Sequence, residues 1–148
     1  MFEQGRRATP EEIAQLIASF DAAGLPELGD TNVSEIASLA ELGAMHTVLA
    51  IPDALPGADS FYTVAELAPA WAAGGGSAHD QDSYRRALAR VADPDYAPEL
   101  LFAPTRLTSS GWWMIDAIHR AVAFFNTRTV AGLTTISLRV FVLSQPLS

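Results

Sequence analysis

Apolar residues in the first part of the chain recur at helical spacing. Thr9–Glu12 combines an N-cap residue, a first-turn proline and a capping-box carboxylate, and it predicts a helix with an apolar stripe reaching Phe20. Asn32–Glu35 predicts the start of a second helix, which ends at Gly43. The pattern therefore predicts an N-terminal helical part over residues 1–45.

Residues 46–148 mix short apolar runs with further helix signals and predict an α/β core. The predicted strands are Thr47–Ile51, Glu99–Ala103, Trp112–Ile115 and Ile136–Leu143, and the predicted helices run from Thr63 to Trp71, from Asp80 or Asp82 to Val91, and from Ala117 to Asn126. The second and third strands are expected to pair antiparallel, and three consecutive glycines predict a flexible connection. With no internal repeat, the chain is expected to be one α+β domain over residues 1–148, a small mixed sheet with packed helices.

Composition limits the classes of function. The chain has 148 residues and a formal net charge of −8, which argues against general binding to nucleic acids or anionic membranes. No apolar run reaches membrane-spanning length, and the N-terminus lacks the apolar core of a signal peptide, so we expect a cytoplasmic protein. Whether it forms a homodimer stays open.

Two residue types are absent, and each absence excludes a kind of chemistry. Without cysteine there is no disulfide, thiolate zinc site or cysteine nucleophile, and without lysine there is no Schiff base or phosphate-loop lysine. All nine basic residues are arginine, a bias typical of bacterial genomes rich in G and C. The three histidines lack the spacing of a compact metal motif, so no metal site is predicted.

The segment Trp112–Phe125 carries the clearest candidate chemistry. It reads as a buried strand followed at once by a helix, with Asp116, His119 and Arg120 at the junction. Cations oppose the dipole at a helix N-terminus, so their presence predicts a bound anion or compensation by the aspartate. The structural alternative is that Asp116 caps the N–H of Ile118 or His119 and both cations are solvated.

Residues Met114–Ala123 resemble the "IDGNHR" type of motif of the ParB/sulfiredoxin-like superfamily, and the resemblance extends over about residues 93–143. The family is a small α/β fold that includes chromosome-partitioning proteins that bind CTP, sulfiredoxins that use ATP, and ADP-dependent serine kinases. The resemblance implies that Asp116, His119 and Arg120 hold phosphate or orient the reacting group. It also implies ATP, ADP or CTP with Mg²⁺ as the cofactor.

Two positions depart from the motif. Ala117 replaces the usual glycine, which narrows the approach of a phosphate to the backbone, and Ile118 replaces the common asparagine. Sulfiredoxins have a cysteine at the position of Ile118, so sulfiredoxin chemistry is excluded. The chain also lacks the basic helical region with which partitioning proteins bind DNA.

Other residues are weaker candidates. Arg106 and Ser109 lie in the loop before the motif strand, where they could reach the same ligand, and Trp112 could stack on it. The remaining polar candidates have plainer interpretations: His46 as a strand-end residue, His79 and Asp80 as loop residues or lid contacts, and Arg85, Arg86 and Arg90 as a solvated helix face.

Three functions follow from these residues. The leading one is a small-molecule enzyme with its ligand at the Asp116–Arg120 turn, by resemblance one of nucleotide-dependent phosphoryl transfer. The second is a cofactor-independent cyclase, lyase or isomerase in which His119 beside Asp116 exchanges protons with an organic metabolite. The third is a non-catalytic binding or regulatory module.

Overall fold

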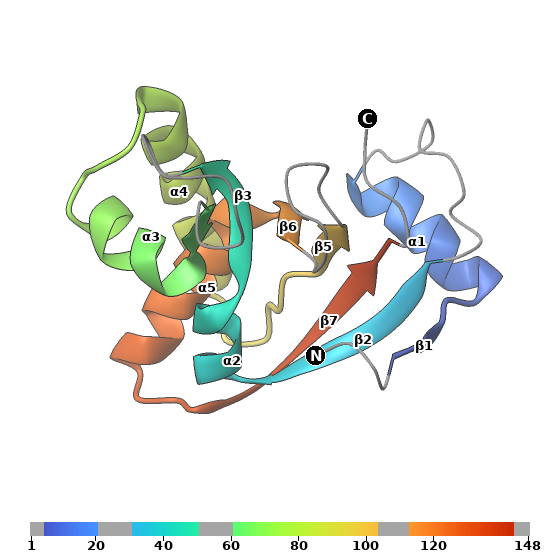
Figure 1. Cartoon of the computed structure of the whole chain (residues 1–148). Coiled ribbons are helices and arrows are strands. Elements are labelled where there is room, and N and C mark those ends of the chain that lie inside the picture. The colour runs from blue at the N-terminus through green and yellow to red at the C-terminus, as the bar shows by residue number, and fades with distance from the viewer. Residues whose placement is uncertain (1–4, 21–30, 51–60, 104–112, 144–148) are drawn as a thin grey trace.

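The structure is a computed structural model that describes residues 5–20, 31–50, 61–103 and 113–143 (Figure 1). In chain order its elements are β1 (Arg6–Arg7), α1 (Pro10–Phe20), β2 (Asn32–Ser38), α2 (Leu39–Ala44), β3 (His46–Ala50), β4 (Phe61–Thr63), α3 (Val64–Ala72), α4 (Ala78–Val91), β5 (Leu100–Ala103), β6 (Trp113–Asp116), α5 (Ile118–Val130) and β7 (Thr135–Val142). The loop predicted before the motif strand lies outside the described residues.

The seven strands form one mixed sheet in the order β1-β2-β7-β5-β6-β3-β4. The β5–β7 and β3–β6 pairs are parallel, and the other neighbouring strands are antiparallel. Five helices accompany the sheet within the described part of the chain. The expected single α+β domain with a mixed sheet is confirmed, as is the antiparallel pairing of β5 with β6.

Two helix starts occur where local sequence predicts them. At α1, the Thr9 hydroxyl accepts a hydrogen bond from the Glu12 N–H at 3.2 Å, and the Glu12 carboxylate accepts one from the Thr9 N–H at 3.0 Å. At α3, Thr63 and Glu66 form the same reciprocal capping box. These signals are reliable because each joins residues only three positions apart.

The helix predicted at Asn32–Glu35 is wrong. Residues Asn32–Ser38 form strand β2, which pairs antiparallel with β7, and the helix begins only at Leu39. Ser38 is its N-cap, since its hydroxyl accepts a hydrogen bond from the Glu41 N–H at 3.1 Å. Pairing with a strand about one hundred residues away outweighs the helical spacing of Ile36 with later leucines. The N-terminal part is therefore not only helical, because it contributes two strands to the sheet.

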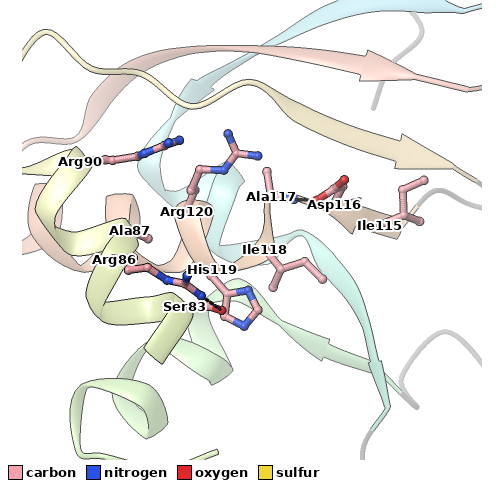
Figure 2. Close-up of a pocket in the computed structure, with 10 residues that line it drawn as sticks. All are labelled: Ser83, Arg86, Ala87, Arg90, Ile115, Asp116, Ala117, Ile118, His119 and Arg120. Atoms are coloured by element: carbon pink, nitrogen blue, oxygen red, sulfur yellow. Dashed lines mark hydrogen bonds between the residues drawn. The ribbon is translucent and has the colours of Figure 1, made fainter. Parts of the chain in front are cut away.

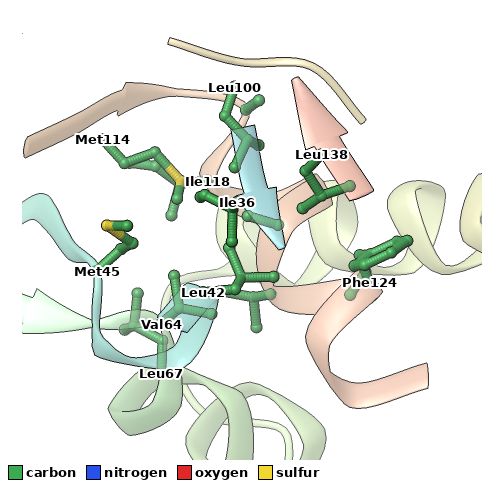
Figure 3. Close-up of a cluster of buried hydrophobic side chains, with 14 of the residues drawn as sticks. Ile36, Leu42, Met45, Val64, Leu67, Leu100, Met114, Ile118, Phe124 and Leu138 are labelled. Atoms are coloured by element: carbon green, nitrogen blue, oxygen red, sulfur yellow. The ribbon is translucent and has the colours of Figure 1, made fainter. Parts of the chain in front are cut away.

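The main hydrophobic core lies between one face of the sheet and helices α2 to α5 (Figures 1 and 3). One face of strand β7 is buried in this core: Ile136, Leu138, Val140 and Val142. A second, smaller cluster on the opposite face includes Leu16 of α1 and Phe141 of β7. Helix α1 therefore covers the sheet on the side away from the other helices.

The glycine segment between α3 and α4 is a tight turn rather than the flexible connection predicted. The Gly75 N–H donates to the Ala70 carbonyl at 2.8 Å, and the Gln81 side-chain amide donates to the Trp71 carbonyl at 3.0 Å. Gly76 has φ +87°, a conformation that glycine adopts without strain. The turn brings the first residues of α4 back against the end of α3.

The start of α4 also differs from the prediction. Ser77, not Asp80 or Asp82, is the N-cap, and its hydroxyl accepts a hydrogen bond from the Asp80 N–H at 3.0 Å. Asp80 stands three residues later and completes the capping box, since its carboxylate accepts from the Ser77 N–H at 3.2 Å. This arrangement leaves the second carboxylate oxygen of Asp80 available to another element.

Candidate functional site

A cavity of about 460 Å³ lies between α4 and the beginning of α5 (Figure 2). Its walls come from two segments far apart in the sequence, helix α4 and the β6–α5 junction. The residues that line it are Ser83, Arg86, Ala87, Arg90, Ile115, Asp116, Ala117, Ile118, His119 and Arg120. The five motif residues Asp116 to Arg120 therefore share one cavity.

Ala117 connects strand to helix in an unusual backbone conformation. Its φ is +66° and its ψ +21°, the left-handed region that costs a residue with a side chain about 1–2 kcal/mol. Ala117 is the only non-glycine residue with positive φ in the described ranges. It stands where the resembled motif has glycine, the residue that this conformation favours. The strand–turn–helix geometry of this junction thus fits a glycine better than the alanine present.

Asp116 does not cap the helix in the way predicted. Its carboxylate accepts a hydrogen bond from the Ala117 N–H at 2.7 Å, not from Ile118 or His119. The N-cap residue of α5 is Ala117, which has no side-chain capping hydrogen bond. The first N–H groups of α5 therefore face the cavity region without a capping side chain, which favours an anion at this end of the helix.

Three arginines line the cavity. Arg86 and Arg90 lie one turn apart on α4, and Arg120 lies in the first turn of α5. Figure 2 shows the side chains of Arg90 and Arg120 extending to the same side of the cavity. Arg86 and Arg90 are exposed, as the prediction of a solvated face requires, but they also face the motif residues across the cavity. Positive charge is thus concentrated here in a chain of net charge −8.

Among the described residues, the lining of the cavity has more arginines than carboxylates. Asp116 is the one carboxylate among the described residues that line it. Arg86 forms an exposed ion pair with Asp82 of the preceding turn at 3.2 Å, a kind of contact that contributes little. An anionic ligand would therefore meet several guanidinium groups and the positive end of α5.

His119 is paired with Asp80 and not with Asp116. Its Nε2 lies 2.9 Å from the Asp80 Oδ1, and the two side chains are 26% and 24% exposed. The imidazole stacks on the indole of Trp71 with ring centroids 4.8 Å apart and an interplanar angle of 11°. His79 meets it edge-on at 5.8 Å. The ring is thus held by α3 and α4 while it lines the cavity from α5.

The environment of Asp80 keeps this residue charged. Burial alone would raise the pKa of its carboxyl, but the hydrogen bonds from His119 and from the Ser77 N–H lower that pKa by more. The net shift is below the ordinary value for aspartate, so Asp80 is a carboxylate at neutral pH. It therefore presents only hydrogen-bond acceptors to the histidine.

Helices α4 and α5 are fastened together along their length. The Asn126 amide of α5 donates to the Tyr84 hydroxyl at 2.8 Å and to the Ala68 carbonyl of α3 at 3.0 Å. The guanidinium of Arg128 is buried and donates to the carbonyls of Val91 at 3.0 Å and Tyr96 at 3.2 Å. These contacts fix the distance between the two cavity walls.

The structure separates the predicted site residues into groups. Asp116, Ala117, His119 and Arg120 line the cavity, and Ile118 lines it too while its side chain packs in the main core (Figure 3). Arg106, Ser109 and Trp112 lie outside the described residues. The sequence prediction missed Ser83, Arg86 and Arg90 as cavity residues. The four-residue spacing of Arg86 and Arg90 could have indicated a shared site, since it puts both on one helix face.

A second hollow of about 500 Å³ lies over β2 and β7, but its charges are already paired. Arg6 donates to both oxygens of Glu12 at 2.5 and 2.7 Å, and Arg139 contacts Glu12 at 3.3 Å and Glu99 at 3.2 Å. Glu35 accepts a hydrogen bond from Ser137 at 3.0 Å. Because these charged side chains bind one another, the network has a structural explanation. The cavity at the start of α5 is therefore the candidate site.

Within the described ranges, no group of three or more histidine and carboxylate side chains is arranged to hold a metal ion. No described helix is both long and apolar enough to cross a bilayer.

Comparison with family models, with curated proteins and with solved structures gave no match to this chain. The ParB/sulfiredoxin-like resemblance accordingly remains a prediction based on the motif residues.

Proposed function

We propose that the cavity between α4 and α5 binds a small molecule that carries phosphate. The observation that carries this proposal is the convergence of Arg86, Arg90 and Arg120 on the uncapped N-terminus of α5. Guanidinium groups match phosphate oxygens in charge and geometry, and a helix N-terminus adds backbone N–H donors. A cavity of about 460 Å³ is within the size range of small-molecule sites.

A nucleotide is the ligand class that the resemblance implies. The left-handed residue Ala117 supports it, because it stands between β6 and α5 where the motif has its glycine. Asp116 is the cavity's carboxylate and would hold Mg²⁺ together with phosphate oxygens. Mg²⁺ so bound would neutralise phosphate charge in phosphoryl transfer, the enzymatic activity we propose for the chain.

Calorimetric titration tests the nucleotide proposal. ATP, ADP and CTP are each added to the full chain with Mg²⁺, and at least one is expected to bind with a dissociation constant below 1 mM, roughly −4 kcal/mol. Absence of binding by all three at millimolar concentration would contradict the nucleotide proposal. Binding without phosphoryl transfer to any tested hydroxyl compound would favour the alternative of a binding or regulatory module.

The hydrogen bond between Asp80 and His119 favours a second function, acid–base chemistry without a nucleotide. An oriented imidazole at a cavity wall is a common general acid or base in isomerases and lyases. In this function Asp80 takes the place predicted for Asp116 as the partner of His119. Once a turnover assay exists, a His119→Ala variant with unchanged turnover would exclude this role.

A further inference from the structure

We propose that Asp80 and Trp71 position His119 as the hydrogen-bond acceptor of the cavity, through Nδ1, for a hydroxyl group on the phosphate-bearing ligand. Asp80 and Trp71 are then positioning residues, and His119 is the residue that touches the ligand. The proposal deepens the function proposed above and rests on it, because it assigns the ligand a second feature beside its phosphate. The ligand class is a phosphate ester that also carries a hydroxyl donor.

The hydrogen bond to Asp80 determines where the proton lies on a neutral His119. Asp80 is an acceptor, so the hydrogen between the two side chains belongs to His119 Nε2, which donates to Oδ1 at 2.9 Å. A neutral imidazole carries one proton, and Nδ1 is then left with a free lone pair. Among the described residues, the structure gives Nδ1 no hydrogen-bond partner.

Two neighbouring rings cover part of the imidazole, and the rest of the side chain is partly exposed at the cavity. Trp71 covers one face of the imidazole, and His79 meets it edge-on. The side chain is still 26% exposed, and it lines the cavity together with Ser83 and Arg86 (Figure 2). An acceptor beside arginines would select a ligand that offers both negative charge and a hydrogen-bond donor.

Several local features of the α3–α4 turn hold the imidazole ring of His119 in place. Gly76, with φ +87°, lies so close to Trp71 and Asp80 that a Cβ there would be 2.9 Å from the indole Nε1 and 3.2 Å from the Asp80 Cβ. Ser77 fixes the other oxygen of Asp80 through its backbone N–H. The glycine turn and the α4 cap thus bring both positioning residues against His119, which a solvated first-turn residue would not need.

Nitrogen NMR tests the positioning role without any ligand. In long-range ¹H–¹⁵N spectra of the full chain, neutral His119 is expected to show a protonated Nε2 and an unprotonated Nδ1. Asp80→Asn should shift the population towards the other tautomer, because an amide can donate as well as accept. Asp82→Asn, a matched change two residues along α4, should leave the His119 signals unchanged. A proton on Nδ1 in the wild type, or no response to Asp80→Asn, would overturn the proposal.

Two simple phosphate esters test the ligand class. Methyl phosphate has no alcohol hydroxyl, whereas ribose 5-phosphate has several, and the second should bind about fivefold more tightly, the factor of one net hydrogen bond. His119→Phe, which keeps a ring on Trp71, should abolish this difference, whereas His119→Asn should retain part of it. Equal binding of both esters to the wild type would overturn the proposal. Failure of both esters to bind would instead contradict the proposed function, and the tautomer result would stand on its own.

Discussion

At the scale of single residues, the chemistry depends on pairings that local sequence does not contain. The motif predicted that Asp116, His119 and Arg120 lie together, and the cavity brings them together. The partner of His119 is thirty-nine positions away on another helix, so no spacing rule could identify Asp80. Arg86 and Arg90 were interpreted as a solvated helix face. The sequence pattern does not distinguish an arginine exposed to bulk solvent from one that lines a cavity.

Ala117 gives a prediction at this scale. Ala117→Gly should change the free energy of unfolding by less than about 1 kcal/mol, since relief of the left-handed conformation offsets the loss of a buried methyl group. Ala117→Val should destabilise the protein by about 2 kcal/mol or more, because a β-branched residue is strained at φ +66°. Urea denaturation of both variants measures the difference. Equal stability of the two variants would contradict the left-handed assignment.

At the scale of elements, the sequence predicts best what neighbouring residues determine. The helix starts at Thr9 and Thr63 are correct because a capping box is complete within four residues. Strand β2 was predicted as a helix because its pairing with β7 is invisible locally. The glycine turn was predicted as flexible because its hydrogen bonds depend on how α3 and α4 pack.

The glycine turn can be tested with two matched variants. Gly74 and Gly76 both have positive φ, so alanine at either costs about 1–2 kcal/mol in backbone strain. At Gly74 an added Cβ meets open space, whereas at Gly76 it would approach Trp71. Gly76→Ala should therefore destabilise the protein by about 1 kcal/mol more than Gly74→Ala in thermal melts. If the two melting temperatures agree, the turn does not pack as described.

Arg128 is the element-scale contact that joins the end of α4 to α5. Its buried guanidinium also lies 4.6 Å from the centroid of the Phe124 ring. Arg128→Lys should lower the free energy of unfolding by about 1–3 kcal/mol, since an ammonium group cannot reproduce the forked hydrogen bonds to the carbonyls at and beyond the end of α4. Arg85→Lys, on the exposed side of α4, should stay within about 0.5 kcal/mol of wild type. Chemical denaturation compares the two, and equal losses would remove Arg128 from this role.

At the scale of the whole molecule, the two faces of the sheet are covered by different helices. Helices α2 to α5 form the main core and the cavity, while α1 closes the opposite face (Figure 1). Arg6 and Arg139 near α1 are paired with glutamates, whereas Arg86, Arg90 and Arg120 line the cavity at the start of α5. The sequence predicted the α+β class from its mixed periodicity, but the strand order required the structure.

The carboxylate of Glu12 in α1 makes the stability of the fold depend on pH in the acid range. The Arg6 hydrogen bond, with help from the Thr9 N–H, lowers the pKa of Glu12 to about 2 from 4.5. Its contribution to stability is complete above about pH 4.5 and is lost as the pH falls towards 2. In denaturation series between these values, Glu12→Gln should lose less stability than wild type, and the exposed neighbour Glu11→Gln should behave like wild type. Parallel curves for wild type and Glu12→Gln would contradict this assignment.

The central claim is that the cavity at the start of α5 binds phosphate, and inorganic diphosphate tests it most directly because it needs neither base nor sugar. Calorimetric titration should show binding to the wild type, and Arg86→Ala, Arg90→Ala and Arg120→Ala should each weaken it about tenfold, the effect of losing a hydrogen bond between charged groups. Arg85→Ala, with the same change in charge on the same helix, should stay within about twofold. Equal weakening by all four variants would show only a general charge effect and would contradict the account, as would no binding to the wild type.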